Sequence, residues 1–383
     1  MANADTPPPP PDASARARAR AYAREHVTDP RLASAVAAGF DAPFFQAGLA
    51  GYSDGAMRLI ARAHGAPFCI TEALLDRKLV DGGRGKRQED PDLLRKEARG
   101  LGDLEENAVA RLDDHPVAGQ VMGTEPEWMA RGAVALAEMG YDVVDVNLAC
   151  PVKKIRKRRR GGHFLAAPDD AIAILRAVRA AVPAQVPCTV KLRRAFDDTP
   201  QMADAFERIF DAAYETGYAV ATVHARTVEQ KYNGPARWPF LRELVRRYPD
   251  RLIFGSGDVW TVDDIFLMLA DTGVHAVSVA RGCIGNPWIF RQARALMAGG
   301  EVLVPTLTEQ REVLLTHHRL AMRLYGERSA TRQMRKFGIR FSTHHPFAPN
   351  DVRRAFTRVD CAAAWQGVLE EHYATPAAAS AAG

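Results

Sequence analysis

The segment Val143-Val144-Asp145-Val146-Asn147-Leu148-Ala149-Cys150-Pro151 has the pattern of a buried strand that runs into a cysteine and is stopped by a proline. In a parallel sheet, such a strand delivers its thiol to the carboxyl edge, where α/β enzymes place their reacting groups. The segment that follows, Lys153 to Gly162, is among the most basic in the chain. Together they predict an α/β enzyme with a thiol beside a surface suited to polyanions. The alternative interpretation is a structural cysteine followed by a solvated, charged loop.

Strand-like and helical segments alternate outward from this point. Strands are predicted at Phe44–Leu49, Phe68–Thr71, Val117–Val121, Val143–Asn147, Cys188–Leu192, Val220–His224, Leu252–Gly255 and Ala276–Ala280. Apolar residues three and four apart predict helices over Glu127–Met139, Asp169–Ala181, Met202–Thr216, Phe240–Arg247 and Val262–Thr272. Eight strands alternating with helices over about 250 residues predict a (β/α)8 TIM barrel, whose active site lies at the carboxyl ends of its strands.

The predicted barrel occupies residues 41–304 and lies between segments of different composition. Residues 1–40 are rich in proline, alanine and arginine, so we expect a disordered tail with at most a short helix. Residues 305–373 have only helical patterns with arginine-rich faces, which predicts a small all-helical domain, followed by a disordered end at 374–383. The charged segment 75–107 is predicted to be an excursion from the barrel.

Composition restricts the class of protein. The 383 residues are 47% hydrophobic and 25% charged, as in globular proteins, and no apolar run reaches the roughly 18 residues of a membrane span. The five scattered cysteines lack the paired spacing of a zinc site. We therefore expect a cytoplasmic protein with free thiols, no membrane partner and no metal. A formal charge of +5 weakly favours an anionic partner.

Polar residues stand at the predicted carboxyl ends of nearly all these strands, where a packed barrel has no structural use for them. They are Glu72, Gln120, Asn147 with Cys150, Lys191, His224 with Arg226, Asp258 and Arg281. The set suits a flavin: Lys191 could stabilise charge on the reduced ring, and Gln120 could bond its pyrimidine edge. Gly257, Asp258, Arg281 and Gly282 could hold its phosphate. For His224, a core histidine or a metal ligand is the alternative.

The same residues lie in motifs that resemble, in order, those of the tRNA-dihydrouridine synthases. These motifs are Gly48–Asp54, Thr71–Ala73, Gly119–Gly123, Asp145–Pro151, Val190–Arg193, Val223–Thr227, Ser256–Asp258 and Ala280–Gly282. In the helical part, Arg335 to His345, Ala348–Asp351 and Arg353–Phe356 are similar to the C-terminal domain of the bacterial B-type members. The resemblance covers about Phe44 to Ala364.

This resemblance implies an FMN-bound barrel that reduces a uridine of folded tRNA at the expense of NADPH. Hydride would pass from flavin nitrogen 5 to carbon 6 of the base, and Cys150 would protonate carbon 5. The implied cofactor residues are Gly48, Leu49, Ala50, Gln120, Lys191, His224, Ser256, Gly257, Asp258, Ala280 and Arg281. The residues implied or expected to contact substrate or RNA are Glu72, Asn147, Lys153, Lys154, Arg156, Arg158, Arg159 and Arg226. We expect Lys153 or Lys154 to stabilise the thiolate of Cys150, and a monomeric protein.

The chain departs from the family pattern at three small residues. Gly48 stands where proline is usual, Ser256 where asparagine is common and Ala280 where glycine is usual; each remains compatible with a flavin. Two other functions stay open: a small-molecule flavin reductase of the dihydroorotate or dihydropyrimidine dehydrogenase type, and an RNA-binding protein without catalysis. The basic helical domain argues against the small-molecule reductase, which does not need one. Cys150 and Lys191 argue against a protein that only binds RNA, because binding alone would not require them.

Overall fold

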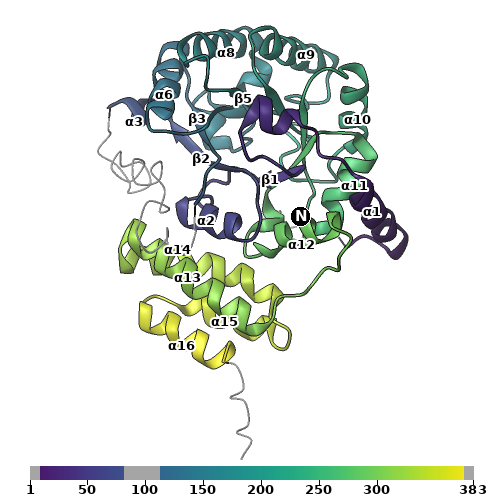
Figure 1. The fold of residues 1–383 in the computed structure, drawn as a ribbon. Helices are drawn as coiled ribbons and strands as arrows, with labels where there is room; N and C mark the ends of the chain where they lie inside the picture. The colour runs from purple at the N-terminus through teal and green to yellow at the C-terminus, as the bar shows by residue number, and fades with distance from the viewer. Residues whose placement is uncertain (1–8, 82–112, 375–383) are drawn as a thin grey trace, which may run out of the picture.

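A closed barrel of eight parallel strands forms the centre of the computed structural model, which describes residues 9–81 and 113–374 (Figure 1). The strands are β1 (Phe44–Gln46), β2 (Cys69–Leu75), β3 (Val117–Met122), β4 (Val143–Asn147), β5 (Cys188–Arg193), β6 (Val220–His224), β7 (Ile253–Ser256) and β8 (Ala276–Val279). Each strand pairs with the next, and β8 closes on β1 with Val277 opposite Phe44. The predicted (β/α)8 barrel is confirmed.

Register across β3, β4 and β5 determines which side chains meet inside the barrel. Gln120 lies opposite Asp145, and Asp145 lies opposite Thr189. One step of two residues further on, Asn147 lies opposite Lys191. Because side chains alternate between the two faces of a strand, these residues share the inner face, while Val144 and Val146 pack outward against the helices.

Helices cover the outside of the barrel (Figure 1). They are α2 (Gly55–Ala63), α3 (Asp76–Asp81), α6 (Pro126–Glu138), α8 (Pro168–Ala181), α9 (Pro200–Glu215), α10 (Trp238–Arg247), α11 (Val262–Thr272) and α12 (Trp288–Met297). Proline in the first turn begins α6, α8, α9 and α10, where its missing N–H costs no hydrogen bond. A capping box of Thr261 and Asp264 begins α11. Most of the segment 75–107 lies outside the described residues.

The N-terminal region differs from the expected disordered tail. Asp12 caps α1 (Ala13–Glu25), whose Ala19 and Ala23 are buried, and α1 packs against α11 (Figure 1). Residues 32–40 then cover the amino-terminal end of the barrel, where Phe40 stacks on Phe68 with ring centroids 5.0 Å apart. The expectation allowed a short helix here but not its burial. Small alanines can bury a helix face closely, and a few large residues suffice to cover the end of the barrel.

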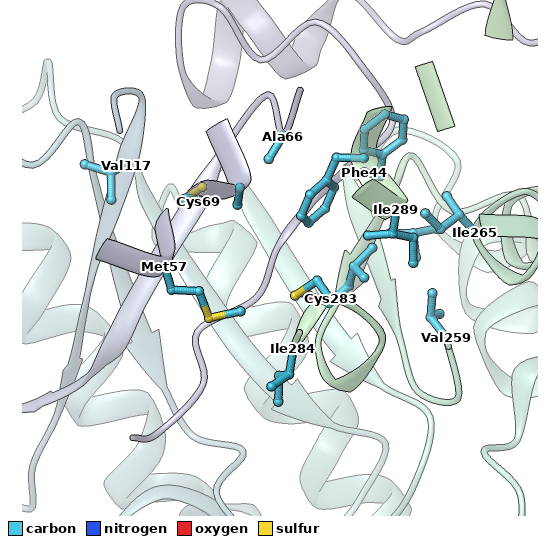
Figure 2. Packing of buried hydrophobic residues seen from close by; sticks show 14 of the residues in the cluster. Phe44, Met57, Ala66, Cys69, Val117, Val259, Ile265, Cys283, Ile284 and Ile289 are labelled. Atoms are coloured by element: carbon cyan, nitrogen blue, oxygen red, sulfur yellow. Dashed lines mark hydrogen bonds between the residues drawn. The ribbon is translucent and has the colours of Figure 1, made fainter. Parts of the chain in front are cut away.

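A continuous hydrophobic core joins the barrel to its surrounding helices. Figure 2 shows part of it, with Phe44 of β1, Met57 of α2, Ile289 of α12 and Cys283 from the turn after β8. Cys69 and Cys283 are fully buried here, and burial raises the pKa of Cys69 to about 12. These thiols are therefore packing groups rather than reactive ones.

The helical region consists of α13 (Leu307–Tyr325), α14 (Glu327–Phe341), α15 (Pro349–Arg358) and α16 (Ala362–His372), as predicted for an all-helical part. It lies beside α2 and α12 (Figure 1), and α13 packs against α2. Phe356 of α15 sits directly over Gly338 of α14, where a Cβ atom would lie only 2.4 Å from the ring. Across residues 9–81 and 113–374, no helix is both long and apolar enough to cross a membrane.

Candidate active site

A cavity of about 490 Å³ opens at the carboxyl ends of the barrel strands, within the size range of small-molecule and cofactor sites. The predicted cofactor residues that line it are Gly48, Leu49, Ala50, Gln120, Lys191, His224, Ser256, Gly257, Asp258, Ala280 and Arg281. Asn147 and Cys150 also line it, together with apolar groups such as Met122 and Val152. The barrel therefore gathers into one cavity residues that lie more than 200 positions apart in the sequence.

A chain of buried hydrogen bonds runs through the barrel floor to the cysteine. Asp145 accepts from Thr189 Oγ1 at 2.6 Å and from Gln120 Nε2 at 2.7 Å. Gln120 Oε1 in turn accepts from Asn147 Nδ2 at 2.6 Å. Asn147 Oδ1 then accepts the backbone N–H groups of Ala149 and Cys150. This chain fixes the amide orientations of Gln120 and Asn147, and it holds the turn that carries the thiol.

Lys191 is a buried cation of the cavity wall that lacks a hydrogen-bond partner among the described residues. Its Nζ is buried and makes no hydrogen bond with the residues that the structure describes. Burial lowers the pKa of Lys191 to about 8, although Asp145 acts in the opposite direction. A buried ammonium without a partner is costly, so this position is built to meet an acceptor or negative charge from a ligand. That requirement fits a flavin ring.

Cys150 lies half-buried at the cavity wall, and burial raises the pKa of its thiol. The backbone N–H of Val152 and the charge of Arg193 act the other way. Lys153 and Lys154 are exposed and do not contribute to this pKa shift, so their expected stabilisation of the thiolate is not what the structure shows. A neutral thiol with a cation in reach suits a proton donor.

Arg193 is a site residue that the strand-end reasoning missed. Its side chain is buried and donates to the carbonyls of Ala149, Thr227 and Lys231 at 3.0, 2.9 and 2.7 Å. It thereby joins the Cys150 turn to the loop after β6. The sequence did indicate this position, because Arg193 follows Lys191 by two residues and both side chains therefore share the inner face of β5.

Gly161 and Gly162 close over the cysteine turn. A Cβ on Gly161 would lie 2.8 Å from Cβ of Cys150, and the N–H of Gly162 donates to the Cys150 carbonyl at 3.0 Å. Gly161 also has a φ of 55°, which favours glycine. The arginine-rich loop therefore ends in two glycines, because a side chain at either position would collide with the turn that carries Cys150.

The phosphate end of the expected flavin site is organised by Asp258. Its carboxylate accepts from Arg226 Nη2 at 2.6 and 2.7 Å and from the Ala236 N–H at 2.7 Å. Arg281 Nη2 lies 3.5 Å away. The Asp258 carboxylate thus holds the arginines in place, which leaves the backbone of this turn and Arg281 as the groups that could meet a phosphate. Arg226, expected to contact substrate, is buried and also donates to the Gly234 carbonyl, so its guanidinium is engaged within the protein.

His224 is held neutral. Burial and the surrounding charges of Arg193, Lys191, Arg226 and Arg281 lower the pKa of His224 well below its usual value. Because Nδ1 accepts from the N–H of Arg226 at 3.2 Å, the ring proton is assigned to Nε2. His224 therefore presents a donor toward the cavity that it lines.

The departure from the family pattern at Gly48 is structurally accommodated. A Cβ on Gly48 would lie 2.4 Å from the carbonyl oxygen of Thr71 and 3.3 Å from Gln120 Nε2. Glycine therefore lets the loop after β1 pass close to β2 and β3. Glu72, expected to contact substrate, accepts the N–H of Gly51 in this loop at 2.6 Å, and burial raises the pKa of Glu72 to about 7.

The basic loop after Cys150 lies at the rim of the cavity, since Val152 and Ile155 line the cavity wall. Lys153 and Lys154 begin the short helix α7 (Lys153–Arg156) and are exposed, as are Arg158 and Arg159. Arg156 pairs with Glu229, and Arg159 pairs with Asp170 at 3.0 Å. Arg158 has no such ion pair within the described residues.

Comparison with known proteins gives a consistent result. Residues 45–375 match the model of the family "Dihydrouridine synthase". A probable tRNA-dihydrouridine synthase of Rhizobium leguminosarum bv. phaseoli is 30% identical, over 75% of this chain and 81% of that protein. tRNA-dihydrouridine synthase B of Shewanella oneidensis is 31% identical, over 78% and 83%. The tRNA-dihydrouridine(16) synthase of Aquipseudomonas alcaligenes is 31% identical, over 61% and 72%.

Proposed function

The chain belongs to the dihydrouridine synthase family, and from this premise we propose that it uses bound FMN to reduce a uridine of tRNA to 5,6-dihydrouridine. The observation that carries the proposal is one cavity in which the thiol of Cys150 and the unpartnered ammonium of Lys191 both face the same space. The first suits a proton donor, and the second suits an electron-rich cofactor.

The residues present fit a flavin mononucleotide. Lys191 would lie against the ring, Gln120 and the loop Gly48–Ala50 would border it, and Arg281 with the turn Gly257–Asp258 would hold the phosphate. Gly257 has a φ of 121°, and Arg281 is flanked by Trp260, 4.5 Å from its ring centroid. When bound, the flavin supplies the hydride that the base receives.

The protein's own contribution is proton delivery and positioning. Cys150 is kept protonated by burial, so its Sγ can give a proton to carbon 5 of the base. The resulting thiolate would be stabilised by the N–H of Val152 and by Arg193. Asn147 keeps the Cys150 turn in place through the two N–H groups that it accepts. Apolar residues of the cavity wall limit water around the thiol.

A surface for RNA is proposed on the rim formed by the loop after Cys150 and on the helical region. Lys153, Lys154 and Arg158 are exposed there, and phosphate contacts need accessible cations. This surface favours RNA over a small-molecule substrate. NADPH as the reductant, a cytoplasmic location, a monomeric state and the absence of a metal stay predictions.

The test is a single-turnover assay. The purified protein, reconstituted with FMN and reduced with NADPH, is mixed with unmodified tRNA, and digested nucleosides are measured for dihydrouridine. We expect a yellow protein that is reoxidised as dihydrouridine forms. Reoxidation by free uracil or orotate but not by tRNA would identify the small-molecule reductase instead. A protein that binds tRNA but retains no flavin would be the RNA-binding alternative.

A further inference from the structure

The loop between β1 and α2, residues 48–54, forms one wall of the cavity, since Gly48, Leu49 and Ala50 line it. Gly51 has a φ of 77°, a conformation that favours glycine, and the loop has no regular secondary structure. A wall of this kind needs external support if it is to hold a ligand in one position. The supports can be identified from the hydrogen bonds of the loop.

Both backbone groups of Gly51 are hydrogen-bonded to ionisable side chains. Glu72 of β2 accepts the N–H of Gly51 at 2.6 Å. Lys336 of α14 donates through Nζ to the carbonyl oxygen of the same residue. The backbone of Gly51 is therefore held by two side chains, one from the barrel and one from the helical region.

Lys336 is itself held in place. Its Nζ also donates to Gln333 Oε1 at 2.6 Å, and it lies 4.6 Å from the ring centroid of Tyr52. The Tyr52 ring packs edge-on against Phe337, with centroids 5.3 Å apart. Lys336 is thus a half-buried group with fixed partners, unlike the exposed arginines of the same helix.

A second contact from the helical region reaches the end of the same loop. Tyr325, the last residue of α13, donates through its hydroxyl to Asp54 Oδ2 at 2.8 Å in a buried position. The other oxygen of Asp54 caps α2 by accepting from the Met57 N–H at 2.9 Å. The helical region therefore fixes both the middle of the loop and its junction with α2.

We propose that Lys336 is a positioning residue for the cofactor: by holding Gly51 against Glu72 it sets the wall Gly48–Ala50, so that the helical region completes the flavin site as well as contacting RNA. The inference rests on the proposed function for the identity of the cofactor. It also gives Glu72, expected from the sequence to contact substrate, a role in positioning this loop.

The competing explanation is that Lys336 contacts RNA, because it also lines a cavity between the barrel and the helical region. The two explanations differ in what happens without RNA. A positioning residue affects flavin binding in the absence of tRNA, whereas an RNA contact affects only tRNA binding.

The experiment measures the FMN dissociation constant by quenching of flavin fluorescence, without RNA, for the wild type, Lys336→Met and Arg332→Met. Arg332 is exposed on the same helix, so its substitution removes an equal charge without touching the loop. We expect FMN affinity to fall about tenfold in Lys336→Met, the effect of losing a charge-assisted hydrogen bond, and to stay within twofold of wild type in Arg332→Met. Lys336→Arg, which can still donate to the Gly51 carbonyl, should recover most of the loss.

Wild-type FMN affinity in Lys336→Met with weakened tRNA binding would overturn the proposal in favour of an RNA contact. An equal loss of FMN affinity in Arg332→Met would also overturn it, because the effect would then be one of net charge. If Lys336→Met does not fold, Tyr325→Phe tests the same link: we expect weaker FMN binding, and unchanged binding overturns the proposal. A wild type that binds no flavin would instead refute the proposed function, so the two failures are distinguishable.

Discussion

Replacing Lys191 with methionine should raise the free energy of unfolding of the flavin-free protein. It should also reduce the further stabilisation that bound FMN provides. Burial lowers the pKa of Lys191 from 10.5 to about 8. Since one pKa unit is worth about 1.4 kcal/mol, the charged lysine costs the flavin-free folded state about 3 kcal/mol. Methionine has a similar length and no charge to desolvate, so the free energy of unfolding should rise by up to about that amount.

The effect has a defined pH dependence. The pKa of Lys191 is lower in the folded than in the unfolded state, so the cost is fully present below about pH 8, where both states carry the charge. Between about 8 and 10.5 the folded state loses its proton while the unfolded state keeps it, and the cost declines. The advantage of Lys191→Met should therefore be largest near neutral pH and shrink as the pH rises through this interval.

Denaturant unfolding of flavin-free wild type and Lys191→Met across this pH range measures the prediction. Lys153→Met is the matched control, because Lys153 is exposed and its loss should change stability by less than about 0.5 kcal/mol. With FMN added, the wild type should become the more stable of the two proteins, since it gains an interaction with the flavin that the variant lacks. A flavin-free Lys191→Met that is less stable than the wild type, or an advantage that does not change with pH, would refute this reasoning.

Three further predictions concern the thiol, the arginine cluster and the rim. Cys150→Ala should leave reduction of the flavin by NADPH intact and slow single-turnover dihydrouridine formation by roughly 10²- to 10⁴-fold; equal rates of RNA reduction would exclude Cys150 as the acid. Asp258→Asn should lower the free energy of unfolding by about 3 kcal/mol, because it leaves the buried Arg226 without its charge partner. Asparagine tolerates the φ of 58° at this position, so an unchanged denaturation midpoint would contradict the electrostatic argument. Arg158→Gln should reduce the slope of log tRNA affinity against log salt by about 0.7 to 0.9, and Arg159→Gln by less because of its pair with Asp170; identical slopes for the two variants would argue against accessible charge as the determinant.

The strand pattern and the residues at the strand ends were accessible from the sequence. The apolar pattern of a strand such as Val143–Asn147 can be recognised from that segment alone. Eight such strands that alternate with helices are typical of a (β/α)8 barrel. The position of each polar residue directly after a strand then places it at one end of the barrel. For the same reason, Lys191, His224 and Arg281 could be assigned to one cavity before any distance was known.

The N-terminal region shows where composition misleads. A low content of large apolar residues predicts disorder when a segment must bury itself alone. Here Ala19, Ala23 and Phe40 pack against surfaces that the barrel already provides. Whether a weakly hydrophobic segment folds thus depends on a partner surface that its own sequence does not describe.

The sequence by itself determined the architecture, the location of the cavity and most of the groups that reach it. These follow from the hydrophobic period, from the order of the strands and from the residues at the strand ends. The partner of each group was decided only by the tertiary structure. Arg226 is turned inward by Asp258, and Arg193 rather than a lysine of the basic loop acts on Cys150. Lys336 bonds a backbone carbonyl 285 residues away. Such pairings depend on barrel closure and on how two folded parts dock, which place side chains within hydrogen-bond distance irrespective of their separation along the chain.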